Sequence, residues 1–234
     1  MIVTSIDGTR IGYDVVGAGP PLLLLHGFSY DRSLWSRTGW VARLRPEFTV
    51  IAIDLRGCGE SDKPESPAAY SLEMHIADIE AVIVELGFEC PVVWGWSLGA
   101  TIALHLAKST SVAATVAAGT YFGPIFTPTY VEARRTEARS ELERVRWSGL
   151  ESWPAVEPDE IRGPLLVYTG TRDGNVAREL RRQRASIEAA GGTLHVLDGL
   201  NHVELATAIE PVAAVVEPLI RAAGRRFSST STRP

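Results

Sequence analysis

The sequence predicts one doubly wound α/β domain, and three observations carry that prediction. The chain has 234 residues, of which 45% are hydrophobic, enough for a single substantial core. Apolar runs of strand length alternate along the chain with longer segments of helical period. The later runs are rich in Val, Leu and Ala, which is typical of strands buried on both faces of a mostly parallel sheet.

The expected elements alternate in order along the chain. Strands are expected over residues 2–5, 10–16, 22–26, 49–54, 91–96, 113–118, 165–169 and 193–197. Helices are expected over residues 33–43, 71–86, 98–108, 176–190 and 203–222, and Pro218 predicts a kink or an early break in the last of them. Ligands of such a sheet bind outside the carboxyl ends of the strands, so residues directly after strands are the functional candidates.

Composition and charge exclude several classes of function. The formal net charge is -5 and no basic run is long, so nucleic acid is not an expected partner. The longest apolar runs are far shorter than the roughly 20 residues of a membrane helix, and the first residues alternate like a hairpin rather than a signal peptide. Cys58 and Cys90 lack metal-ligand or redox spacing, which predicts free thiols in a reducing compartment. We therefore expect a cytoplasmic protein without metal or cofactor; its oligomeric state stays open.

A serine stands at a junction between strand and helix. Gly95-Trp96-Ser97-Leu98-Gly99 follows the fifth expected strand and opens the helix at 98–108. This is the G-x-S-x-G nucleophile elbow, in which a sharp turn exposes the serine oxygen and the helix N-terminus favours developing negative charge. A Gly-rich turn with a serine N-cap is the alternative interpretation.

A serine nucleophile needs a general base, and His202 is the candidate. It lies just beyond the last expected strand, in a loop before the last helix. The other histidines at positions 75, 105 and 195 fall within expected helices or strands, which indicates structural roles. His26 is also expected to be structural, tying its own loop together.

The base needs an acid that orients it, and Asp173 is the candidate. It follows the seventh expected strand in a Gly-flanked turn, where its alternative role is a helix N-cap. Asp198 and Glu204 lie too close in sequence to His202 to be obvious partners, and Asp159 lies in a Pro-rich loop. The sequence thus predicts Ser97, Asp173 and His202 as the catalytic residues.

Acyl transfer also needs donors for the developing oxyanion. The elbow supplies the backbone N–H of Leu98, the residue after the nucleophile. The second donor is expected from the loop after the third strand, where His26-Gly27 turns the chain and places the N–H of Phe28.

These residues resemble the α/β-hydrolase superfamily, in its branch of small bacterial serine esterases with pimeloyl-ester-hydrolase-like and non-haem haloperoxidase-like members. The resemblance extends from "DGTRIGYDVVGAGPPLLLLHGF" to "GLNHVELATAIEPVAAVV" and includes "DLRGCGESDKP", which is similar to the D-x-R-G-x-G-x-S turn of that family. It implies an α/β-hydrolase fold with a mostly parallel eight-stranded sheet, helices on both faces and a structural role for that turn.

The resemblance also implies a chemistry. Haloalkane dehalogenases and epoxide hydrolases of this fold have an aspartate at the elbow, so Ser97 argues against both. We expect a serine hydrolase that cleaves carboxylic esters, or lactones or thioesters, of small to medium size through an acyl-enzyme. The alternatives are a carbon–carbon bond hydrolase or a haloperoxidase-like perhydrolase with the same triad, and a small-molecule receptor or binding protein.

The cap of this family is expected to be reduced. Residues 1–122 and 164–224 would form the core, 123–163 a lid, and 225–234, which lack apolar period, a disordered tail. The lid is expected to hold one solvated helix from Tyr130 to Trp147 that opens easily, with i,i+3 ion pairs such as that of Glu143 with Arg146. Aromatic residues are expected to line a shallow substrate pocket: Trp96, Tyr121, Phe122, Phe126, Trp147 and Trp153.

Overall fold

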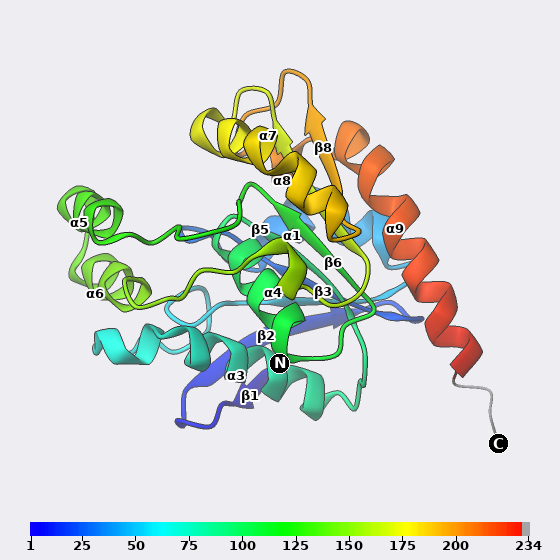
Figure 1. Cartoon of the computed structure of the whole chain (residues 1–234). Coiled ribbons are helices and arrows are strands. Elements are labelled where there is room, and N and C mark those ends of the chain that lie inside the picture. Colours follow the sequence, from blue (N-terminus) through cyan, green and yellow to red (C-terminus); the bar gives the residue numbers. More distant parts are fainter. Residues whose placement is uncertain (231–234) are drawn as a thin grey trace.

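The computed structural model describes residues 1–230, with side chains as far as Arg225. Within this range one sheet of eight strands has the order β1-β2-β4-β3-β5-β6-β7-β8 (Figure 1). Strand β2 is antiparallel to both of its neighbours, β1 and β4. All the other strand pairs, from β4 across the sheet to β8, are parallel. The predicted fold class, a mostly parallel eight-stranded sheet with helices on both faces, is therefore confirmed.

The strands lie close to their expected positions. They are β1 Ile2–Thr4, β2 Arg10–Val16, β3 Pro21–Leu25, β4 Thr49–Ile53, β5 Val92–Trp96, β6 Ala114–Ala118, β7 Leu165–Gly170 and β8 Thr193–Leu197. The helices are α1 Ser33–Arg37, α2 Trp40–Leu44, α3 Leu72–Glu85, α4 Leu98–Ser109, α5 Pro128–Glu137, α6 Glu141–Leu150, α7 Gly174–Ala189, α8 Glu204–Thr207 and α9 Ile209–Thr230. Two short 3-10 turns, η1 Pro67–Tyr70 and η2 Pro158–Glu160, connect them.

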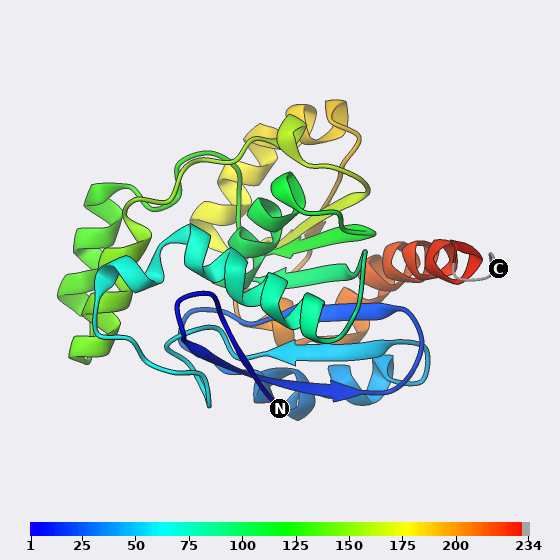
Figure 2. The ribbon, with the colours of Figure 1, turned by 90° about the horizontal axis from the view of Figure 1, so that it is seen from below.

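Alternate side chains of the central strands build two cores on opposite faces of the sheet. Leu22 and Leu24 of β3 pack in a core with residues of α1, α2, α8 and α9. Leu23 and Leu25 pack in the other core, with residues of α3 and α4. Figure 2 shows α3 on one side of the strands and the blue helices α1 and α2 on the other. Burial on both faces explains the uninterrupted apolar runs of these strands.

Two expected helices are each divided in the structure. The segment 33–43 forms α1 and α2, because Gly39 between them takes a left-handed backbone with φ of 92°. The segment 203–222 forms α8 and α9, separated at Ala208. Pro218 was expected to kink or end the last helix, yet α9 continues beyond it. Proline has no backbone N–H, so the carbonyl of Ala214, four residues earlier, lacks its helical donor. Both residues are exposed, so water can solvate that carbonyl.

The cap contains two helices, so the expected single lid helix is wrong. Thr127 caps the N-terminus of α5 by accepting a hydrogen bond from the N–H of Tyr130. Ser140 caps α6 by accepting from the N–H of Glu143, whose carboxylate accepts from the N–H of Arg139. This cap chemistry starts a new helix within the charged segment, and the Ser-x-x-Glu pattern signals it in the sequence.

Helix α9 extends into the segment expected to be disordered. It ends at Thr230, so residues 225–230 are helical. Residues 231–234, the remainder of that expected tail, lie outside the described residues. None of the helices within residues 1–230 is both long and apolar enough to cross a membrane.

Two buried histidines flank a tryptophan where the cap meets the core. The ring of Trp153 lies 5.0 Å from that of His75 and 6.3 Å from that of His105, and its Nε1 donates to the carbonyl of Tyr70 at 3.0 Å. Burial lowers the pKa of His75 to about 3 and that of His105 to about 4. Both rings are therefore neutral in the folded protein near neutral pH.

These lowered pKa values predict a loss of stability in mild acid. The unfolded chain binds protons at both histidines below about pH 6.5, whereas the folded protein does not until about pH 4 or below. The free energy of unfolding should fall as the pH falls through this window, by up to about 1.4 kcal/mol per pH unit for each histidine. Urea unfolding between pH 7 and pH 5 measures this slope. His75→Phe should make it shallower, and an unchanged slope in that variant would contradict the prediction.

Candidate active site

Ser97 lies in a strained turn between β5 and α4. Its φ of 56° and ψ of -119° make it the one non-glycine residue with positive φ among those described. The N–H of Ser97 donates to the carbonyl of Ala118 at 2.8 Å, and that of Gly99 donates to the carbonyl of His26 at 3.1 Å. The surrounding structure thus holds an unfavourable backbone conformation, which projects the side chain from the end of the sheet.

The glycines of the elbow are required by close backbone contacts. A Cβ atom on Gly95 would lie 2.1 Å from the carbonyl oxygen of Gly99, and one on Gly99 would lie 2.3 Å from that of Leu25. A Cβ atom on Gly27, in the loop after β3, would lie 3.2 Å from the Cβ of Ser97. Only residues without side chains allow strand, turn and helix to approach this closely.

His202 lies between Ser97 and Asp173. Its Nε2 is 2.9 Å from the Oγ of Ser97, and its Nδ1 is 2.9 Å from Oδ1 of Asp173. The carboxylate is nearly buried and accepts a second hydrogen bond from the hydroxyl of Thr169 at 3.0 Å. Asp173 stands at the N-cap position of α7, but its side chain makes no cap hydrogen bond. The structure therefore brings together the three residues that the sequence predicts to be catalytic.

Strand pairing explains how Asp173 and His202 meet. Gly170 of β7 pairs with Leu197 of β8, so the loops after these strands begin side by side. The N–H of Arg172 donates to the carbonyl of Leu200 at 3.0 Å and joins the two loops. A Cβ atom at Gly170 would lie 2.0 Å from that same carbonyl oxygen, so the absence of a side chain there allows the two loops to come into contact.

The segment that carries His202 is held by hydrogen bonds from the core. The Nε1 of Trp96 donates to the carbonyl of His202 itself at 2.8 Å. The hydroxyl of Tyr168 donates to the carbonyl of Leu205, and the Nε1 of Trp40 to that of Ala206, both at 2.9 Å.

Glu204, rejected above as the acid, has a structural role beside His202. Its carboxylate accepts from the N–H of Asn201 at 2.7 Å, and the side chain of Asn201 accepts from the N–H of Glu204 at 3.1 Å. This reciprocal pair fixes the start of α8, directly after the candidate base.

The two residues expected to supply the oxyanion donors border the same cavity. Phe28 and Leu98 both line the cavity into which Ser97 opens. In the part of the chain that the structure describes, no acceptor is assigned to either backbone N–H. His26 is fully buried and holds the loop after β3, which carries Phe28. Its Nε2 accepts from the N–H of Leu55 at 3.0 Å, and its Nδ1 donates to the carbonyl of Gly27 at 2.8 Å. Burial lowers the pKa of His26 to about 4, which favours this neutral form.

Comparison with known proteins identifies the family. Residues 20–136, half of the chain, match the family described as the alpha/beta hydrolase fold. The chain belongs to this family. The expected membership of the superfamily is thereby confirmed.

Relatives within this hydrolase family have different activities in their names. The chain is 34% identical over 102 residues to a soluble epoxide hydrolase of Corynebacterium sp. (strain C12), which covers 44% of this chain and 34% of the relative. It is 33% identical over 102 residues to a pimeloyl-[acyl-carrier protein] methyl ester esterase of Vibrio vulnificus, which covers 42% of this chain and 35% of the relative. The match spans about a third of the length of these curated relatives.

Solved structures of hydrolases share the whole fold. A thermophilic esterase from Thermogutta terrifontis has a TM-score of 0.82 at 22% identity, with 96% of this chain and 98% of the esterase covered. At this identity the likeness shows the shared fold.

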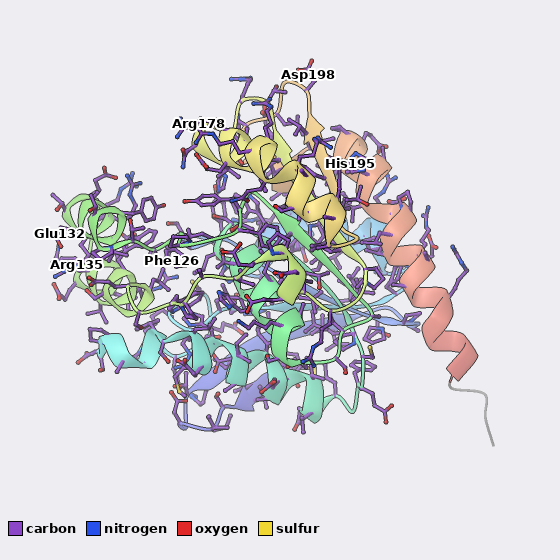
Figure 3. All side chains as sticks on the ribbon, viewed as in Figure 1. Phe126, Glu132, Arg135, Arg178, His195 and Asp198 are labelled. Carbon is purple, nitrogen blue, oxygen red and sulfur yellow. The ribbon has the colours of Figure 1, made fainter. Side chains whose placement is uncertain are left out.

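The cavity at Ser97 has a volume of about 210 Å³ and lies between the elbow and the cap. Three of the six aromatic residues expected in the pocket line it: Tyr121, Phe126 and Trp147. Phe126 lies between the cap helices and the sheet, whereas Glu132 and Arg135 lie on the outer side of α5 (Figure 3).

The other three expected pocket residues do not line the cavity. Trp96 is buried beneath His202, with the two rings 5.5 Å apart. Phe122 is buried in the core between α4, β7 and α7. Trp153 lies between the two buried histidines at the base of the cap. Each was expected in the pocket because of its place in the sequence, but core packing takes the side chain elsewhere.

Several lining residues were not expected. Among them are Thr101, Gly119, Thr120, Tyr130 and Asn175. Gly119 and Thr120 directly follow β6, so the rule that ligands bind beyond strand ends identifies them. Thr101 lies one helical turn after Ser97 and faces the same side. No group of three or more His, Cys, Asp or Glu side chains among the described residues could hold a metal ion.

The hydrogen bond from Trp96 to His202 predicts a stability effect. Trp96→Phe leaves the carbonyl of His202 without its buried donor, which should cost about 1–3 kcal/mol of unfolding free energy. Trp147→Phe is the control, since it keeps an aromatic ring stacked on Phe28. Urea unfolding and hydrogen exchange of the peptide 200–208 measure both variants. Equal stability and exchange in the two would show that this hydrogen bond does not hold the loop.

Proposed function

We propose that the chain is a serine hydrolase that cleaves carboxylic esters, or lactones or thioesters, through an acyl-enzyme on Ser97. The observation that carries this proposal is the position of His202, with one ring nitrogen 2.9 Å from the hydroxyl of Ser97 and the other 2.9 Å from the carboxylate of Asp173. A hydroxyl, an imidazole and a carboxylate in this order are the parts of a Ser-His-Asp triad.

The proposed reaction begins with the transfer of a proton. Nε2 of His202 takes the proton of Ser97 while the serine oxygen attacks the carbonyl carbon of the substrate. Asp173 accepts the hydrogen bond of Nδ1 and so holds the imidazole in the tautomer whose Nε2 is free to act as a base. The imidazolium then gives its proton to the leaving alcohol or thiol, and a water molecule releases the acyl group by the reverse sequence.

The oxyanion of the tetrahedral intermediate would accept hydrogen bonds from the N–H groups of Phe28 and Leu98. Leu98 is the first residue of α4, so its N–H is one of those that a helix N-terminus leaves without a partner inside the helix. Preorganised donors of this kind stabilise negative charge in the transition state more than in the substrate.

The elbow residue favours ester cleavage over epoxide opening. One relative is named an epoxide hydrolase and another an ester esterase, so the similarity alone leaves both reactions possible. Epoxide opening in this fold depends on alkylation of a carboxylate at the elbow, and this chain has Ser97 there. A serine oxygen instead suits acyl transfer from an ester, lactone or thioester.

The cavity supports an uncharged substrate of small to medium size. Its volume is about 210 Å³, and its lining contains aromatic, aliphatic, hydroxyl and amide side chains with no Asp, Glu, Lys or Arg. Charged acyl groups would lose their hydration there without gaining an ion pair.

Substitutions of the triad should behave as changes to one unit. Ser97→Ala and His202→Ala should each lower kcat for p-nitrophenyl acetate by about 10⁴ to 10⁶, and Asp173→Asn by less. The double variant of Ser97 and His202 should lose no more than either single variant. Losses that multiply in the double variant would contradict a shared unit, and substantial hydrolysis by Ser97→Ala would overturn the proposed function.

The cavity predicts a preference among acyl groups. Straight-chain p-nitrophenyl esters of short and medium acyl length should react fastest, and kcat/KM should fall well before about twelve carbons because the cavity has little room for longer chains. The measurement is a series of esters followed below and above the solubility limit of each. A preference for the longest chains, or a sharp rise in rate when the ester forms an emulsion, would contradict this prediction.

A further inference from the structure

The cap buries one arginine directly beside the candidate oxyanion loop. Arg146 of α6 is 6% exposed, although the sequence predicts an exposed ion pair with Glu143. That pair is not formed, because Glu143 instead caps its own helix. No carboxylate within the described residues pairs with the guanidinium of Arg146. A buried cation without an anionic partner is costly, so its remaining contacts need an explanation.

Those contacts converge on Phe28. Nη2 of Arg146 donates to the carbonyl of Phe28 at 2.7 Å, and the guanidinium carbon lies 4.0 Å from the centre of the Phe28 ring. The next residue of α6, Trp147, stacks on the same ring with the centroids 4.0 Å apart and the planes at 18°. Cys58 completes the cluster, with its Sγ 3.0 Å from Nη2 of Arg146. Two adjacent residues of the cap therefore hold both the carbonyl and the side chain of Phe28.

The core is shaped to admit this arginine. At Gly57, in the loop after β4, the backbone has φ of 80°, and a Cβ atom would lie 2.8 Å from Cδ and 2.9 Å from Nε of Arg146. A side chain at position 57 would thus push the guanidinium away from Phe28. The stem of Arg146 lies along this backbone, while its planar head combines a charge-assisted hydrogen bond with stacking, which the point charge of a lysine does not do.

From these contacts we propose that Arg146 is a positioning residue, which acts through Phe28 to keep the backbone N–H of Phe28 aimed at the oxyanion. This inference rests on the proposed function, in which that N–H is one of two donors. With the carbonyl bound and the ring stacked, rotation of Phe28 about its own backbone bonds is restricted. The thiol of Cys58 also donates a long hydrogen bond, at 3.6 Å, to the carbonyl of Phe28. Nearby, the loop is held by the hydrogen bond from the N–H of Tyr30 to the carbonyl of Gly27 at 3.1 Å and by His26.

Three variants on one helix test this role. Arg146→Met keeps an unbranched apolar side chain, shorter than that of arginine, and removes the donors, whereas Arg146→Lys keeps a charge and a donor but loses the planar head. Arg144→Met is the matched control, because Arg144 is two residues away, exposed, and pairs with Glu141 at 2.8 Å. For each variant, kcat and KM are measured with p-nitrophenyl acetate, at a temperature well below its thermal midpoint.

A second readout isolates the oxyanion. Phenylboronic acid adds to a serine hydroxyl and becomes a tetrahedral anion, so its inhibition constant reports the stabilisation of that charge. Arg146→Met should lower kcat about 10- to 100-fold, less than the loss from deleting an oxyanion donor, with KM within about threefold of wild type. Its affinity for phenylboronic acid should fall in parallel. Arg146→Lys should retain part of kcat and part of the affinity for phenylboronic acid, with each at least about threefold below wild type. Arg144→Met should match wild type in both quantities.

The outcomes separate this inference from the proposed function. If wild-type hydrolysis depends on Ser97 but Arg146→Met keeps kcat and boronate affinity, the inference is overturned and the proposed function stands. A change in KM alone also overturns it, since the cap would then act on substrate binding. If Arg146→Met does not fold, a folded Arg146→Lys with wild-type kcat and boronate affinity overturns it equally. Wild-type protein without Ser97-dependent hydrolysis would overturn both.

Discussion

The strained backbone of Ser97 is the constraint on which the rest of the site depends. A positive φ at a residue with a side chain costs free energy, and the turn persists because β3, β5 and α4 approach too closely to allow another path. The same close approach places the loop at Gly27 and Phe28 against the serine. This close approach of the backbone thus sets the positions of the candidate nucleophile and of the loops that carry both candidate oxyanion donors, and a Cβ atom at Gly95 or Gly99 would clash with it.

The loop of His202 depends on a different principle, the mutual satisfaction of buried polar groups. Trp40, Trp96 and Tyr168 contribute large apolar rings to the core, and each carries a donor that needs a partner when buried. The carbonyls of the segment 202–206 supply those partners. The core therefore fixes this loop through three separate donors, although 39% of the His202 side chain remains exposed to solvent. Packing and catalytic geometry are coupled here, because a change in the core would move the candidate base.

The sequence predicted best what is governed by local pattern. Ser97, Asp173 and His202 each lie in a segment that follows a strand, so the rule for strand ends selected them as candidates, and the pairing of β7 with β8 brings the last two together. The cap was predicted less well: its helical period was visible, but the break before Ser140 depends on cap chemistry. Arg146 was missed because spacing alone suggested an ion pair with Glu143, and only the tertiary contact with Phe28 decides between the two partners. Long-range contacts of this kind have no signal in one sequence.

The two cap helices differ in how closely they pack against the core. Helix α6 is packed tightly: a Cβ atom on Gly149 would lie 2.4 Å from the carbonyl oxygen of Pro67, and Trp153 just beyond it is buried. Helix α5 is held less closely, and Tyr130, which lines the cavity, remains 42% exposed. For the proposed reaction, a movement of α5 would leave the contacts of Arg146 with Phe28 intact, whereas a displacement of α6 would disturb them. Under the proposed function, α5 would then admit substrate while α6 keeps the contacts of Arg146 with Phe28.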